Sequence, residues 1–178
     1  HHRARAARGF VLLWRTVHER ASLPILTLRL TERGLYDRWD HCQALAGYAA
    51  RFAASDRFDP EQLTTRLATS LNEVLEYVFR ARPGGEGEVA LHIVRTDTQS
   101  VVEVTLPADA ALAERLRAEL ERLALPDARE RYAAGFQAML AGAPAEAGLL
   151  ELVALHGVTL SLRDDAGAAT ILLSLPHE

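Results

Sequence analysis

The sequence predicts an α/β fold, a two-layer sandwich in which a mixed, mostly antiparallel sheet of about five strands carries helices on one face. Three observations predict it. Short segments alternate apolar and polar residues at the period of two that half-buried strands show. Longer segments between them repeat apolar residues at helical spacing. Two pairs of alternating segments are joined by short turn sequences, which is typical of antiparallel hairpins.

Composition limits the classes of protein to be considered. A chain of 178 residues can bury one sizeable core without needing a second. Its net charge of -4 gives no general reason to expect nucleic acid or an anionic membrane as a partner. All 20 Lys and Arg residues are arginine, which excludes a lysine Schiff base or a P-loop. Cys42 is the single cysteine, so no internal disulfide forms, and a cytoplasmic protein is expected.

The chain divides into an N-terminal segment, 1–22, and one domain, 23–178. His1 and His2 resemble the end of a purification tag. Residues 3–20 predict an amphipathic helix that packs on its own domain or on a second subunit, or lies on an anionic membrane surface. No apolar run reaches the roughly 18 to 20 residues of a spanning helix, so membrane insertion is not expected. The apolar stripe of this helix is Phe10, Leu13, Trp14 and Val17.

The first half of the domain predicts one strand and two helices. Residues 26–30 alternate at period two and predict an outer strand. Residues 36–52 predict a helix with Cys42 on its apolar stripe, which favours a small buried side chain over a reactive thiol. Asp59, followed by proline, is a plausible N-cap for a long helix over 60–82. Its core face is Leu63, Leu67, Leu71, Val74, Leu75 and Val78.

A hairpin and two helices are predicted next. Residues 88–95 and 100–106 alternate with their apolar side chains on one face, so they pair around a polar turn. Asp109 is the expected N-cap of a helix over 110–123, where leucines recur at core spacing. A further helix starts at Asp127, predicted as its cap, and stops near a Gly-Ala-Pro sequence.

The end of the chain predicts a short helix and a second hairpin. The sequence Glu146-Ala-Gly-Leu-Leu-Glu opens the helix, and His156 stands at its C-terminal end before a glycine. A catalytic base is the alternative reading of His156, and the helix-end position is the simpler one. Residues 158–162 and 170–175 alternate around an Arg-Asp-Asp-Ala-Gly turn and predict the last two strands.

This order of elements resembles the histidine-kinase-like (GHKL, or Bergerat) ATPase fold, most closely the SiaB-type and anti-sigma-factor kinase-like single-domain proteins. The resemblance covers about 26–175. In this family the long helix carries Glu-x-x-x-Asn, where the glutamate polarises the attacking group and the asparagine helps to hold magnesium. Glu73 matches the glutamate. Tyr77 stands at the asparagine position, and a phenol is not the hard oxygen ligand that magnesium demands. Asn72, the nearest asparagine, points about a quarter-turn away.

The two glycine-rich boxes of the family are also altered. Asp109 is the remnant of the Asp-x-Gly-x-Gly box that reads adenine, but no glycine follows it. Gly148 is the remnant of the Gly-x-Gly-Leu-Gly-Leu helix start, whose free amides embrace phosphates. Glu146 would bring a negative charge to the place of the triphosphate. The glycines at 84, 85 and 87 precede a strand and signal a turn, not a phosphate loop.

The resemblance and the altered residues together favour a non-catalytic bacterial signalling protein that uses a degenerate GHKL fold as a protein-binding module. Active members phosphorylate a small partner protein in modules that control cyclic-di-GMP output or a sigma factor. The expected partner is therefore a protein, which includes a second copy in a homo-oligomer, with no nucleic acid, cofactor or metal site.

Two alternatives stay open. A divergent ATP-dependent serine/threonine protein kinase would use Glu73 in catalysis, Gly148 and Asp109 toward ATP, and magnesium held in another way. A structural or assembly component would instead dock through the N-terminal helix.

Overall fold

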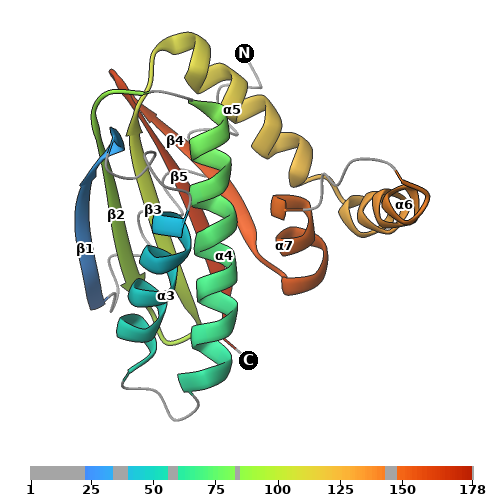
Figure 1. Cartoon of the computed structure of the whole chain (residues 1–178), viewed down its shortest axis with the longest axis horizontal. Coiled ribbons are helices and arrows are strands. Elements are labelled where there is room, and N and C mark those ends of the chain that lie inside the picture. The colour runs from blue at the N-terminus through green and yellow to red at the C-terminus, as the bar shows by residue number, and fades with distance from the viewer. Residues whose placement is uncertain (1–22, 34–39, 56–59, 83–84, 143–147, 178) are drawn as a thin grey trace, which may run out of the picture.

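A computed structural model describes residues 23–33, 40–55, 60–82, 85–142 and 148–177. The strands and helices follow the predicted order (Figure 1). They are β1 (Leu23–Thr31), α3 (Asp40–Ala54), α4 (Pro60–Ala81), β2 (Glu88–Arg95), β3 (Gln99–Pro107), α5 (Ala110–Leu123), α6 (Ala128–Leu140), α7 (Gly148–His156), β4 (Thr159–Asp165) and β5 (Ala168–Pro176).

The sheet has five strands in the order β1-β2-β3-β5-β4, and β1 is an edge strand as expected. All four neighbouring pairs are antiparallel, so the sheet is fully antiparallel where a mixed, mostly antiparallel sheet was expected. The chain re-enters the sheet at the end where β1 stopped, because Glu88 at the start of β2 pairs with Thr31 at the end of β1. Glu32 N donates to Gly87 O over 2.9 Å at that end. The last strand, β5, lies between β3 and β4.

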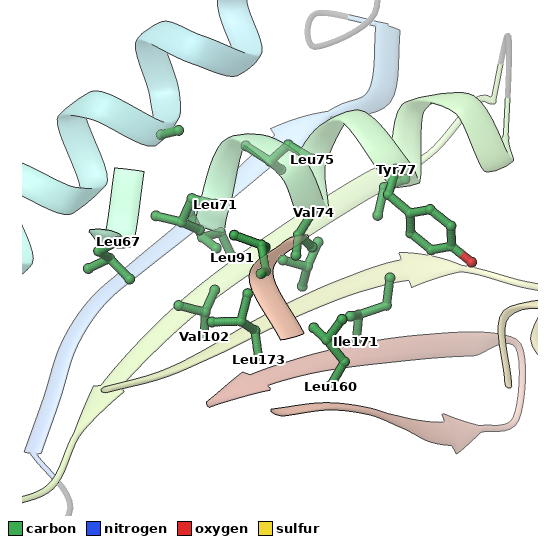
Figure 2. Close-up of a cluster of buried hydrophobic side chains, with 14 of the residues drawn as sticks. Leu67, Leu71, Val74, Leu75, Tyr77, Leu91, Val102, Leu160, Ile171 and Leu173 are labelled. Carbon is green, nitrogen blue, oxygen red and sulfur yellow. The ribbon is translucent and has the colours of Figure 1, made fainter. Parts of the chain in front are cut away.

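The predicted two-layer arrangement is confirmed. Figure 1 shows α3 and α4 in front of the sheet, and α6 standing away from it beyond α7. The core lies between α4 and the strands, where leucines of α4 meet Leu91, Val102 and Leu173 (Figure 2). Cys42 of α3 belongs to this core with none of its surface exposed, which confirms the prediction of a small buried side chain.

The start of β1 and the capping of α6 differ from expectation. Strand β1 begins at Leu23, because a bulge between Pro24 and Leu26 lets pairing with β2 continue past the proline. Asp127 occupies the predicted N-cap position of α6, but its side chain makes no capping bond to the helix. Its carboxylate instead accepts from Arg131 Nε over 2.9 Å. Residues 36–39 and the predicted cap Asp59 lie outside the described part of the chain.

Candidate functional site

A cavity of about 940 Å³ lies between α4, α5, α6 and α7. Polar side chains of α4 and α5 line one side, and α6 contributes an aromatic pair. Helix α7 contributes its first residues, including Gly148. Glu73 of α4 also lines this cavity, so the fold brings together two of the three residues expected from sequence.

Glu73 and Gly148 are in very close approach. A Cβ atom added to Gly148 would lie 2.6 Å from Glu73 Oε2 and 3.8 Å from Arg80 Nη2. Any side chain at this first residue of α7 would require the Glu73 carboxylate to move from its present position. Burial raises the pKa of Glu73, the neighbouring Glu76 raises it further, and Arg80 opposes both. The carboxylate thus occupies the beginning of the helix where the family resemblance puts phosphates.

Tyr77, one helical turn after Glu73, is held by a partner on another helix. Its side chain is 7% exposed, and its hydroxyl donates to Glu119 Oε2 of α5 over 2.9 Å. Figure 2 shows the ring extending from α4 with its hydroxyl directed away from the leucine cluster. Burial and the bond to Glu119 raise the pKa of Tyr77, so the phenol stays neutral. Both partners line the cavity, and their bond crosses between α4 and α5.

Asn72 does not substitute for the missing asparagine. Its Nδ2 donates to Glu76 Oε1 over 2.7 Å, one turn along the same helix, and Asn72 does not line the cavity. This agrees with the quarter-turn that separates adjacent residues of a helix.

Asp109 lies away from Glu73 and Gly148. Its Oδ1 accepts from Leu112 N over 2.8 Å, which confirms the predicted N-cap of α5. Asp109 lines a separate hollow of about 400 Å³, together with Arg82, Pro107 and Gly167. The two hollows share no described lining residue, so the structure does not connect Asp109 with the cavity of Glu73 and Gly148. A nucleotide contact by Asp109 stays a prediction.

The residues that sequence reasoning missed are arginines and aromatics. Arg80, Arg115, Arg122 and Arg131 line the cavity, and so do Tyr132 and Phe136, whose rings stack with centroids 6.4 Å apart. A signal for part of this set was present in α5. Residues 115, 119 and 122 are spaced by four and three, so an arginine, a glutamate and an arginine share one face of that helix.

Several expectations fall on residues that the structure does not describe. Glu146, the predicted obstacle to a triphosphate, and the amphipathic helix of residues 3–20 are both outside the described ranges. Within those ranges, no group of three His, Cys, Asp or Glu side chains is placed to hold a metal ion. None of the described helices is both long enough and apolar enough to cross a membrane.

Comparison with known proteins identifies a structural relative. No family model and no curated protein matches the sequence. A chain in the crystal structure of the SiaB–SiaC complex from Pseudomonas aeruginosa superimposes with a TM-score of 0.59. The chain has a SiaB-like fold. The alignment covers 93% of this chain and 97% of the other, and the two are 19% identical.

Proposed function

We propose that this chain is a non-catalytic regulatory protein of bacterial signalling, which binds a protein partner through a SiaB-like fold. The observation that carries this proposal is the Tyr77–Glu119 hydrogen bond inside the cavity. It puts a neutral phenol, already committed to a partner, where the kinase motif requires an amide oxygen for magnesium. The solved relative is a complex of two proteins, which supports a protein as the ligand.

The position of Glu73 also supports loss of kinase chemistry. Its carboxylate lies against Gly148 at the start of α7, so it competes for the space that a phosphate would need. Like charges at this distance repel strongly in a partly desolvated site. A triphosphate would have to displace Glu73 before it could reach the helix amides.

The divergent-kinase alternative has one observation in its favour. Glu73 and Gly148, the two retained motif residues, line the same cavity. An active enzyme would need both at the reacting end of ATP, so their proximity keeps this alternative open.

Calorimetric titration with a non-hydrolysable ATP analogue, with and without magnesium, tests the proposal. We expect no magnesium-dependent heat at millimolar analogue. Micromolar binding that requires magnesium would overturn the proposal. In that case the Glu73→Ala variant would be assayed for phosphoryl transfer, with Arg51→Ala on α3 as the matched surface control, because Arg51 is exposed and does not line the cavity.

A further inference from the structure

The cavity carries charge opposite to that of the chain. Among the described residues that line the cavity, arginines outnumber acids, with four guanidinium groups against the two carboxylates of Glu73 and Glu119. The whole chain has a net charge of -4, so this excess is local. Both carboxylates also have internal neighbours: Glu119 accepts from Tyr77, and Glu73 lies against Gly148. Arg131 also pairs with Asp127, so the positive charge that faces a ligand comes mainly from Arg80, Arg115 and Arg122.

One of these guanidinium groups has an unused donor. Arg131 donates from Nε to Asp127 and from Nη2 to the backbone oxygen of Arg122. Its Nη1 is buried and has no hydrogen-bond partner among the described residues. The Arg131 side chain as a whole is 24% exposed, so an acceptor that reaches Nη1 after a shift of the side chain would satisfy a donor that now has no partner. A carboxylate is the acceptor that matches a guanidinium best among protein side chains.

An apolar surface adjoins the arginines. Only Ala128 of α6 is buried, whereas Phe136 is 43% exposed and Leu140 is 67% exposed. Phe136 stacks on Tyr132, and this pair forms a shelf on the cavity wall. Arginine beside exposed aromatic side chains is the composition typical of the energetic centre of protein interfaces.

We propose that this cavity docks an acidic segment of a protein partner, with carboxylates on Arg122, Arg80 and Arg131 and an apolar side chain on the Tyr132–Phe136 shelf. This inference rests on the proposed function and names the chemistry of the partner. The two arginines of α5 that line the cavity are seven residues apart, about 10 Å along the helix axis. Single carboxylates spread along a peptide can reach such separated arginines and avoid Glu73. A triphosphate concentrates its charge over a shorter span, and the Glu73 carboxylate beside Gly148 opposes it.

Selection from a phage-displayed library of random peptides tests the proposal on the full chain. We expect the enriched peptides to carry several acidic residues with an aromatic or leucine anchor. A synthetic copy of an enriched peptide is then titrated by fluorescence anisotropy. Added salt should weaken its binding, because the ion pairs at the cavity mouth are partly exposed.

Variants locate the site. Arg122→Glu should weaken the peptide at least about tenfold, which corresponds to about 1.4 kcal/mol. Phe136→Ala should weaken it about fivefold through loss of the shelf. Arg51→Glu, an exposed charge reversal on α3, is the matched control and should change binding less than about twofold. Circular dichroism and thermal melts establish that each variant is folded.

Three results would overturn the proposal: no enrichment, enriched peptides without acidic residues, or equal affinity for the Arg122→Glu variant. These failures are distinct from failure of the proposed function, which is decided by magnesium-dependent binding of the ATP analogue. Absence of both peptide and nucleotide binding would leave a non-catalytic protein whose partner uses another surface.

Discussion

Gly148 and Glu73 form a coupled pair, because the Glu73 carboxylate fills the space beside the Gly148 backbone. Gly148→Ala should lower the free energy of unfolding by about 1 kcal/mol, since its Cβ would force Glu73 to move. In a Glu73→Ala background the same change should be neutral or stabilising, because alanine favours helix more than glycine does. Chemical denaturation of the four proteins in this double-mutant cycle measures the coupling. Additive effects would contradict the contact.

Glu73 also predicts a dependence of stability on pH. Burial, Glu76 and Glu151 raise its pKa against the opposing effect of Arg80. The folded state therefore retains the proton more strongly than the unfolded state, whose carboxyl has a pKa near 4.5. The resulting stability is present below about pH 4.5 and is lost as pH rises through the raised pKa.

Glu73→Gln removes this titration. The difference in unfolding free energy between the variant and the wild-type protein should therefore shift in favour of the variant as the pH rises from about 4 to neutral. Urea unfolding across this range is the measurement. A difference between the two proteins that does not vary with pH would show that Glu73 titrates normally.

Glu32 is a buried carboxylate that depends on one cation. Its side chain is fully buried, and Arg82 Nη1 lies 3.1 Å from Glu32 Oε1. Burial raises the pKa of Glu32, and Arg82 lowers it. Arg82→Ala should cost about 3 to 5 kcal/mol at neutral pH, because it leaves a buried charge without its partner.

The cost of Arg82→Ala should shrink as the pH falls, since a protonated Glu32 needs no cation. Arg29→Ala is the control, because the Arg29–Glu88 ion pair is exposed and should contribute less than about 1 kcal/mol. Equal losses in the two variants would contradict the buried pair.

At the scale of the element, Asp109 caps the N-terminus of α5. Its carboxylate accepts from Leu112 N, so Asp109→Ala should cost about 1 kcal/mol while Asp109→Ser should retain most of the stability. Asp127→Ala is a matched comparison, because Asp127 makes no capping bond to α6 and its pair with Arg131 is half exposed. Guanidinium denaturation distinguishes them. An equal cost for both alanine variants would contradict the difference in capping.

Helix α6 is largely exposed to solvent. Ala128 is its single buried residue, and α7 is its main neighbour. Most of the helix therefore gains little from the core of its own domain, which leaves its aromatic side chains available to a ligand.

At the scale of the whole molecule, stability depends on the layer between α4 and the sheet. Leu71 is fully buried there, so Leu71→Ala should lower the free energy of unfolding by about 2 to 5 kcal/mol. Leu140→Ala, at a site 67% exposed, should change it by less than about 0.5 kcal/mol. Thermal and chemical unfolding of the two variants measure the contrast. Comparable losses would mean that α6 is packed in solution.

Local pattern determined the elements of this protein and the composition of its core. Alternation identified the strands, and helical periodicity identified the leucine face of α4, because each depends only on residues a few positions apart. The cap at Asp109 followed for the same reason. The character of Tyr77 as a poor metal ligand was also readable from its side-chain chemistry.

Tertiary structure decided what depends on residues far apart in the chain. The fully antiparallel order of the sheet depends on how helices return the chain between strands. The Tyr77–Glu119 bond joins residues 42 positions apart, and the guanidinium groups around the cavity come from three helices. Sequence periodicity does not predict these contacts, because they form only when one helix packs against another. The sequence by itself determined which surfaces are apolar, and the fold decided which charges face one another.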